Sequence, residues 1–265
     1  MPRSTVHAVG DKHAAKNSEG LGVADIVQRL EEEIALGLLR PRERLVEDDL
    51  LARFNVKRHV IRQVLVELEL MGMVTRRPNR GAAVRDFTTI EIEQIYFVRD
   101  LLERAAVEVM PLPVPVDVLR KLEDLHARHC AAVTAGRLRQ VFRLNLEFHQ
   151  TFFDACGNRP LTEAISQFAF RAHAIQSYAI ADPKLLARVC KEHAQLIKLT
   201  RGTDRQALSE LVAKHKQPAK MAYIEVSRRI EGHIENPPQM TRATSVAAAR
   251  ANGASGLPPS RTRKQ

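Results

Sequence analysis

The sequence predicts a mainly α-helical protein with an N-terminal winged helix-turn-helix domain followed by a C-terminal antiparallel all-α bundle. Three observations lead to this prediction. The chain has 265 residues, which is enough for two domains. Its first part reads as three short helices and a hairpin, the order of elements in a winged helix. From Thr88 onward, apolar residues recur every three or four positions between Pro and Gly breaks, as in a helical bundle.

Composition narrows the class of protein. The chain carries 41 Lys and Arg against 31 Asp and Glu, a net charge of +10 that favours a polyanionic partner. It has no apolar run long enough to span a bilayer and no secretory signal, so we expect a cytoplasmic protein without a membrane partner. Cys130, Cys156 and Cys190 are far apart and form no CxxC motif. We expect ordinary core cysteines in a reducing compartment, not disulfides or a thiolate zinc site.

Composition also divides the chain into four segments. Residues 1–20 have no apolar period and are predicted to be a disordered arm. Residues 21–86 form the predicted winged helix-turn-helix domain, and residues 88–232 form the predicted helical domain. Residues 233–265 are rich in Pro, Gly, Ser, Ala and basic residues, and are predicted to be a disordered basic tail.

Helical periodicity and turn residues place the elements of the first domain. Pro41 ends the first predicted helix, and acidic residues occupy the first turn of the second, where the helix dipole favours them. Gly72 is placed to cap the third helix. The predicted helices cover residues 23–39, 47–54 and 57–72, and a hairpin with its turn at 77–81 covers residues 73–85.

The polar residues of the third helix lie near its N-terminal end and off its apolar stripe. Basic and amide groups in this position are typical of a helix that enters the major groove of double-stranded DNA. Residues 57–85 hold seven basic residues against two acidic ones, so positive charge gathers on this helix and on the wing. The alternative is an ordinary solvated basic surface. The predicted DNA-binding residues are Lys57, Arg58, His59, Arg62 and Gln63 on the helix, and Arg80 and Gly81 in the wing.

These residues resemble the winged helix-turn-helix of GntR-family regulators. The features that carry the resemblance are Pro41, Leu45-Val46-Glu47, Leu50, Val56, Arg58, Arg62, Leu65, Leu68, Gly72-Met73-Val74 and Arg80-Gly81. The resemblance implies that Arg58 and Arg62 contact operator bases or phosphates, and that the wing around Gly81 approaches the minor groove.

The sequence departs from this family at three places. Arg42 stands where the family usually has Gly, and Asp48 stands where a basic or polar residue is usual. Residues 57–60 read Lys-Arg-His-Val where Ser-Arg-Thr-Pro is more common. The departures leave the predicted fold intact but make the usual operator sequence an uncertain guide.

The second domain is predicted to contain six helices joined by short connections. Proline residues lie near the starts of three of them and glycines near the ends, as helix boundaries favour. Pro218 is predicted to kink the last helix. The predicted helices are residues 88–110, 115–135, 137–156, 160–181, 183–201 and 204–232.

Polar side chains interrupt the apolar stripes of three of these helices. Asn145 and His149 are four residues apart on the same face, and His193 and His215 interrupt the stripes of two later helices. Three imidazoles and a carboxamide oxygen suit a divalent transition metal with open coordination positions. The alternative is that each histidine is a core residue that hydrogen-bonds to a neighbour.

Arg99 also interrupts an apolar stripe, in the first helix of the predicted bundle. A guanidinium that points into the bundle would suit the carboxylate of a bound small molecule. The alternative is an ion pair with Glu103, one turn further along the helix.

The second domain resembles the FCD effector domain of FadR-type GntR regulators. The resemblance rests on LNLEFHQTFFDACGNRPL, KEHAQLI and RGTDRQALSELVAKH, and six helices suggest the shorter VanR-like variant. It implies a divalent ion, with zinc, nickel and manganese as candidates. An inward-facing Arg99 beside such an ion favours a small organic acid as the effector. The implied metal ligands are Asn145, His149, His193 and His215.

Together these predictions favour an effector-controlled transcriptional regulator, not an enzyme. We expect a repressor that binds a short inverted repeat of double-stranded DNA as a homodimer. One alternative is a metal-dependent hydrolase, because three histidines and an open position could activate water. Another is an architectural DNA-binding protein whose helical domain takes no ligand.

Overall fold

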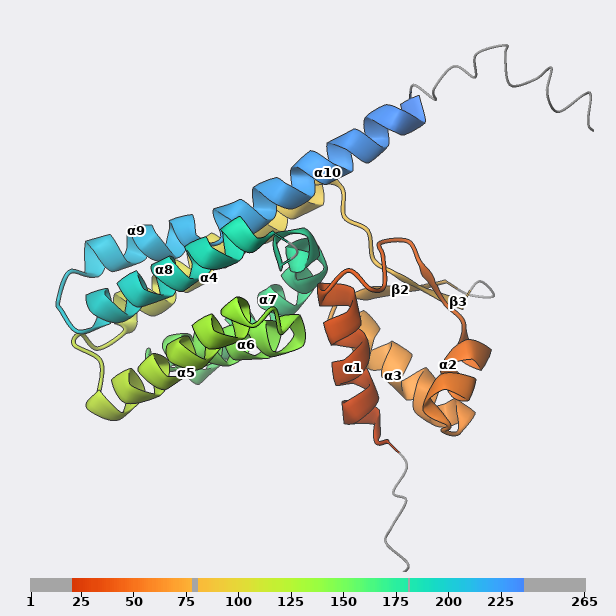
Figure 1. The fold of residues 1–265 in the computed structure, drawn as a ribbon, viewed down its shortest axis with the longest axis horizontal. Helices are drawn as coiled ribbons and strands as arrows, with labels where there is room; N and C mark the ends of the chain where they lie inside the picture. Colours follow the sequence, from red (N-terminus) through yellow and green to blue (C-terminus); the bar gives the residue numbers. More distant parts are fainter. Residues whose placement is uncertain (1–20, 78–80, 181, 236–265) are drawn as a thin grey trace, which may run out of the picture. The chain divides into compact units, whose positions relative to one another are not determined.

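A computed structural model describes residues 21–77, 81–180 and 182–235 (Figure 1). The predicted arm, most of the predicted tail and the tip of the wing, which includes Arg80, lie outside the described residues. Residues up to Ile224 belong to one compact unit. Among the described helices, none is both long enough and apolar enough to cross a bilayer.

Residues 23–84 form a three-helix domain with a small antiparallel sheet. The strand order is β1-β3-β2, with Arg44 opposite Ala83 and Val74 opposite Val84. The strand β1 was not predicted, because two residues carry no recognisable alternation. The elements are α1 (Val23–Ala35), β1 (Arg44–Leu45), α2 (Glu47–Phe54), α3 (Arg58–Leu70), β2 (Val74–Arg77) and β3 (Gly81–Val84).

The helix α1 is shorter than predicted. It ends at Ala35, and Gly37 then takes a left-handed conformation with φ 70 that turns the chain before Pro41 is reached. The helix α2 has the predicted bounds, and α3 begins one residue later and ends two residues earlier than predicted.

The second part of the chain is a helical bundle with seven described helices. The single helix predicted over residues 204–232 is two helices that meet at Lys216, so the six-helix prediction is wrong. Pro218 has no N–H to donate to the carbonyl of Lys214, and that carbonyl accepts from the Lys216 N–H instead. The helices are α4 (Thr89–Val109), α5 (Val116–Thr134), α6 (Leu138–Asp154), α7 (Arg159–Ile180), α8 (Pro183–Thr200), α9 (Arg205–His215) and α10 (Gln217–Glu235).

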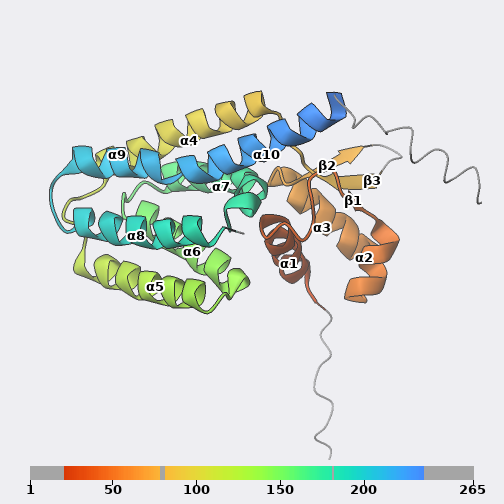
Figure 2. The ribbon, with the colours of Figure 1, turned by 45° about the horizontal axis from the view of Figure 1, so that its top comes forward.

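The helices of the bundle pack through their apolar faces. The helix α5 lies beside α6 and α8, and α4 packs on α7 and α9 (Figure 2). Large apolar side chains, among them Leu122, Phe148 and Phe152, are fully buried between the helices. The interior of the bundle is therefore apolar, and each polar side chain in it needs a specific partner.

The winged helix and the bundle share a packed boundary. The apolar core around Ile26 and Leu68 continues onto Ala172 of α7 and Tyr223 of α10. Polar contacts reinforce it, because Tyr223 donates a 2.9 Å hydrogen bond to Asp86 in the connection between the two parts. The winged helix therefore contacts the bundle through side chains and is also connected to it through the chain itself.

Three consecutive acidic residues of α1 are buried at or near this boundary. Glu31 pairs with His173 of α7, Glu32 pairs with Arg143 of α6, and Glu33 pairs with Arg53 of α2. Buried carboxylates are costly unless they are paired, so these contacts fix how α1 lies against its neighbours.

Candidate functional site

The exposed face of α3 carries the basic residues that the sequence singled out. Arg58 and Arg62 are largely exposed, with 52% and 61% of their side-chain surfaces accessible. Both are held by acids of α2: Arg58 lies 2.7 Å from Asp48, and Arg62 lies 3.2 Å from Glu47. These contacts order two cations at the N-terminal end of the helix while leaving them open to solvent.

The other predicted residues of this surface are also exposed where the structure describes them. Lys57 precedes α3, and His59 lies in its first turn. Gln63 donates a hydrogen bond to Glu67. Gly81 begins β3 with φ 75 and open space around its α-carbon, so the wing backbone there is accessible.

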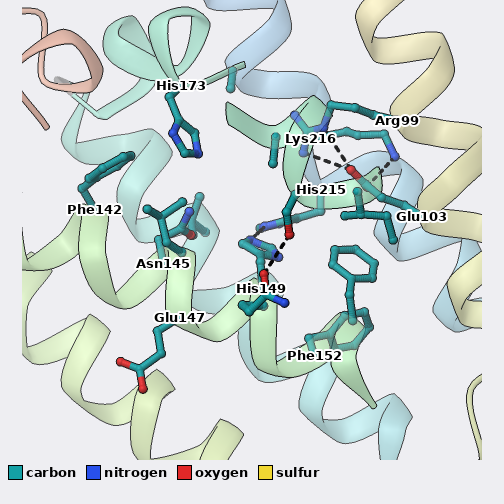
Figure 3. Close-up of a pocket in the computed structure, with 18 of the residues that line it drawn as sticks. Arg99, Glu103, Phe142, Asn145, Glu147, His149, Phe152, His173, His215 and Lys216 are labelled. Carbon is teal, nitrogen blue, oxygen red and sulfur yellow. Dashed lines mark hydrogen bonds and ion pairs between the residues drawn. The ribbon is translucent and has the colours of Figure 1, made fainter. Parts of the chain in front are cut away.

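A cavity of about 460 Å³ lies inside the bundle (Figure 3). Side chains from all seven helices of the bundle line it, and most of the lining is apolar, with Phe142 and Phe152 among the aromatic walls. A volume of this order accommodates a small organic molecule. The polar groups that face it are few, so each one restricts what the cavity can bind.

Three histidines meet beside this cavity, and two of them, His149 and His215, line it. His149 of α6, His193 of α8 and His215 of α9 place their ligand nitrogens within 4.8 Å of one another. The Nε2 atoms of His149 and His215 are 3.2 Å apart. Two nitrogens that share a metal ion at about 2.1 Å are separated by about 3.0 to 3.4 Å, so the spacing suits a metal site.

Burial gives a second reason to regard the three histidines as ligands. Both ring nitrogens of His193 are buried and have no hydrogen-bond partner among the described residues, although the ring stacks on Phe148. A histidine satisfied by its neighbours would not leave two polar atoms unpaired. Burial and the nearby His215 hold the pKa values of His149 and His193 well below 6.5, so both rings are neutral at pH 7, the form that binds metals.

Glu192 orients one of these rings. Its Oε2 atom lies 2.7 Å from Nδ1 of His215, which leaves Nε2 of that ring directed at His149. Burial acts to raise the pKa of Glu192, but hydrogen bonds with His215 and Arg188 outweigh it, and the pKa is lowered. In many metal sites, a carboxylate accepts a hydrogen bond from the histidine nitrogen that does not bind the metal, and this contact fixes the orientation of the ring.

Asn145 and His215 lie where the sequence patterns indicated. Asn145 lines the cavity one turn before His149 (Figure 3). His215 is the last residue of α9, immediately before the break caused by Pro218. The break leaves His215 in contact with His149, so the kink does not misdirect this ring.

Arg99 faces the cavity and is also paired with Glu103, so both predicted environments occur together. Its guanidinium lies 3.0 Å from Glu103, which in turn lies 2.9 Å from Nζ of Lys216. Burial disfavours the charge on Arg99, but Glu103 and Tyr96 outweigh this effect and raise its pKa. The Nη1 atom of Arg99 is buried without a hydrogen-bond partner in the described part of the chain, which leaves one donor for a ligand.

Several residues of this region could not be identified from the sequence. Lys216 adds a second buried cation beside Arg99, and His173 adds a ring to the wall of the cavity nearest α1. Helical periodicity would have placed each on an inward face, but their partners lie 113 and 142 residues away in the chain.

The cysteine prediction needs a correction. Cys130 and Cys190 are not isolated core residues, because α5 and α8 bring both thiols close to His129. Only Cys156 has the expected character, buried beside the backbone of Asn158. Spacing along the chain concealed the cluster, since the two cysteines belong to separate helices.

Comparison with known families agrees with this arrangement of domains. Residues 23–84 match the family described as "Bacterial regulatory proteins, gntR family". Residues 94–217 match the FCD domain.

Similar proteins are transcriptional regulators. An uncharacterized HTH-type transcriptional regulator of Bacillus subtilis, YdhC, is 24% identical over 71% of this chain and 84% of its own length. The HTH-type transcriptional repressor RspR of Escherichia coli K12 is 22% identical over 72% of this chain and 84% of its own. Among solved structures, McbR/YncC of Escherichia coli has the same fold, with a TM-score of 0.67, 19% identity, and coverage of 78% of this chain and 99% of its own.

Proposed function

This chain belongs to the GntR family of transcriptional regulators and carries an FCD domain. We propose that it is a metal-dependent repressor of transcription whose DNA binding is controlled by a small carboxylic acid. Both families and the similar proteins are regulators and not enzymes, which sets the hydrolase alternative aside. The repressor role is proposed because one relative bears that name.

Operator binding is assigned to α3 and the wing. The supporting observation is that Arg58 and Arg62 are ordered by acids of α2 yet stay exposed at the N-terminal end of α3. Helices of this kind enter the major groove with their first turns, where arginine reads guanine. The remaining DNA contacts are proposed for Lys57, His59, Gln63, Gly81 and Arg80.

Gel-shift titration of an operator selected from random DNA tests this assignment. Arg62→Ala should weaken binding by about 1–3 kcal/mol if the side chain contacts a base. Arg128→Ala is a matched control, because Arg128 is also more than half exposed but pairs with Asp124 on α5 of the bundle. Equal binding by wild type and Arg62→Ala would remove this face of α3 from the operator interface.

A divalent metal is proposed at His149, His193 and His215, with Asn145 as a further oxygen ligand. The observation that carries this proposal is the unpaired, buried ring of His193. Glu192 positions His215, and Phe148 positions His193 by stacking. A bound cation would supply a Lewis-acidic position for an anionic group of the effector.

The proposed effector is a small carboxylic acid with an apolar or aromatic body. Arg99 has a free donor inside the cavity, and Lys216 lies beside it, so the polar end of the cavity favours an anion. Most of the remaining lining is apolar, with both aliphatic and aromatic side chains, which favours an apolar body. Glu103 pairs with both cations, and Asp100 also pairs with Lys216.

Thermal-shift measurements with zinc and a panel of organic acids test both proposals. Zinc should raise the melting temperature of wild type but not of His193→Ala, and acids that bind should shift wild type more than Arg99→Met. Arg104→Ala is the control, since Arg104 is an exposed arginine of the same helix, paired with Asp100. Equal shifts in wild type and His193→Ala would restore the interpretation of these histidines as core residues.

Homodimerisation through α4 is proposed from its exposed apolar face. Ile90, Phe97 and Leu101 recur at helical spacing, and each side chain is at least 55% exposed. An apolar stripe of this length suits contact with a second copy and would present two α3 helices to an inverted repeat. Phe97→Glu should give a monomer in sedimentation analysis. Val116→Glu, at a similarly exposed site on α5, should leave the assembly unchanged.

A further inference from the structure

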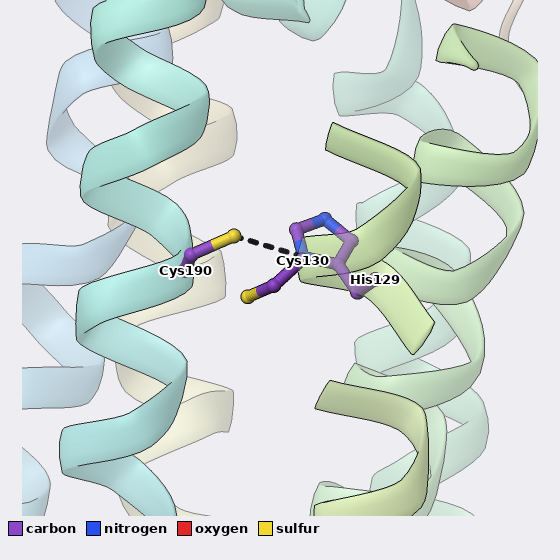
Figure 4. Close-up of side chains that lie close together, drawn as sticks. All are labelled: His129, Cys130 and Cys190. Atoms are coloured by element: carbon purple, nitrogen blue, oxygen red, sulfur yellow. Dashed lines mark hydrogen bonds between the residues drawn. The ribbon is translucent and has the colours of Figure 1, made fainter. Parts of the chain in front are cut away.

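A second group of metal-binding side chains lies outside the proposed histidine site (Figure 4). Cys130 and His129 belong to α5, and Cys190 belongs to α8 on the facing side. Their ligand atoms all lie within 4.8 Å of one another. None of the three takes part in the proposed DNA contacts or in the proposed histidine site.

The spacing of these atoms matches a coordination sphere. Nδ1 of His129 lies 3.6 Å from Sγ of Cys190. In a tetrahedral site with metal–sulfur and metal–nitrogen bonds of about 2.3 and 2.1 Å, the two ligand atoms are about 3.6 Å apart. One turn earlier on α5, Nδ1 of His126 lies 3.6 Å from Sγ of Cys130, which supplies a fourth donor next to the group.

Burial indicates that His129 is placed to bind a ligand. Its side chain is fully buried, and its Nε2 atom has no hydrogen-bond partner among the residues the structure describes. The contact of Nδ1 with a thiol at 3.6 Å is weak compared with a bond to an amide or hydroxyl. Both thiols are partly exposed, so an ion can reach the group from solvent.

Charge and softness decide which cation fits. Two thiolates would neutralise a divalent ion, so a half-buried site would hold it without excess charge. The three-histidine group offers only neutral ligands, and it therefore differs in chemical class from a site with two soft sulfur donors. Zinc, which accepts both sulfur and nitrogen, is the natural probe for such a mixed set.

We propose that His129, Cys130 and Cys190 form a second, thiolate metal site that binds zinc or a similar thiophilic d10 cation, with His126 as the fourth ligand. Binding forms two metal–sulfur bonds and releases the two thiol protons to solvent. The bound ion joins α5 to α8 through ligands about 60 residues apart in the chain. His129 also lines the cavity proposed for the effector, and its ring centroid lies 5.1 Å from that of His193, but neither Cys130 nor Cys190 lines that cavity.

The experiment uses the full chain, purified under reducing conditions with its affinity tag removed, stripped with chelator and dialysed against zinc. Elemental analysis should find one more zinc per chain in wild type than in Cys130→Ser/Cys190→Ser. His149→Ala should lose the zinc ion of the three-histidine site and keep the zinc ion of the cysteine site. The zinc content of the two variants therefore tests the two proposed sites separately. Cys156→Ser is the matched control and should bind as much zinc as wild type.

Cobalt substitution gives a readout that a merely structural role of the cysteines would not change. Cobalt-loaded wild type and Cys156→Ser should show sulfur-to-cobalt charge-transfer absorption in the near ultraviolet, and the double serine variant should lack it. Unchanged zinc content in the double variant, or the absence of this absorption in wild type, would overturn the proposal. Recovery of a Cys130–Cys190 disulfide from cells lysed in alkylating agent would also overturn it.

Discussion

Nδ1 of His173 lies 2.8 Å from Oε1 of Glu31, and both side chains are buried. His173 forms part of the cavity wall, where its ring packs edge-on against Phe142, whereas Glu31 belongs to the first helix of the winged domain. The contact therefore joins the proposed effector cavity to the proposed DNA-binding domain, as does the pair of Glu32 with Arg143, another residue of the cavity wall. An effector that moves Phe142 or His173 would act on α1 directly.

A double-mutant cycle should detect this contact. Removing either partner leaves the other buried and unpaired, so His173→Ala and Glu31→Ala should each lower the free energy of unfolding by about 1–3 kcal/mol. The two effects should not add, with an interaction energy of about 0.5–3 kcal/mol in urea unfolding. Additive losses would show that the two side chains are energetically independent.

Asp48→Asn should strengthen binding to DNA. Asp48 lies 2.7 Å from Arg58 and is exposed on the same face, where its charge would repel phosphate. The ion pair is exposed, so it contributes little to the stability of the fold. Releasing the arginine should therefore increase affinity by up to about fivefold at low salt, as measured by fluorescence anisotropy.

Asp49→Asn is the matched control for this substitution, because Asp49 is the next acid in the first turn of α2 and is also exposed. If both variants bind equally well, the gain reflects net charge alone and not the release of Arg58.

The metal-free protein should lose stability as the pH falls below 6.5. Burial first, and then His215, lowers the pKa values of His149 and His193 well below that value in the folded state. Between the unfolded and folded pKa values, the unfolded chain takes up protons that the folded chain does not. Stability should therefore fall with pH by about 1.4 kcal/mol per pH unit for each histidine.

His193→Phe provides the comparison, because a phenyl ring can keep the stacking on Phe148 without titrating. The chelator-treated variant should show a shallower loss of unfolding free energy between pH 7.5 and 5.5 than the chelator-treated wild type. Parallel curves would mean that His193 does not contribute to the pH dependence.

Gly72→Ala should destabilise the boundary between the two domains. Gly72 has φ 75, where an L residue costs about 1–2 kcal/mol, and a β-carbon would lie 2.8 Å from Cγ of Arg171. Gly136→Ala has φ 65 but open space, so it should show the backbone cost alone in urea unfolding. Arg171→Ala should remove the excess cost of Gly72→Ala, and an excess that persists would contradict the clash.

Much of the fold could be predicted because its helices are amphipathic. Periodicity also placed His149, His193 and His215 on inward faces of three helices, which is why their convergence could be expected. The preference of this family for glycine at position 42 has a structural reason, since Arg42 has φ 69.

The rest depended on contacts between distant parts of the chain. The contact of His215 with Glu192 of α8 and the approach of Cys130 to Cys190 could not be predicted from the local sequence, because each forms only when the helices pack together. The strand β1 forms only where Arg44 and Leu45 meet β3. The break after His215 followed from Pro218, but the number of helices did not, because a proline can either kink or end a helix.

The end of α9 at His215 also gives the proposed histidine site a helix terminus. The aligned peptide dipoles of α9 place a partial negative charge, equivalent to about half an electron, beside its last turn. A cation held by His215 would therefore lie at the end of a helix that attracts it, although none of the three histidine ligands carries a negative charge. Were α9 continuous with α10, this charge would be displaced toward Glu235, far along the chain from the ligands.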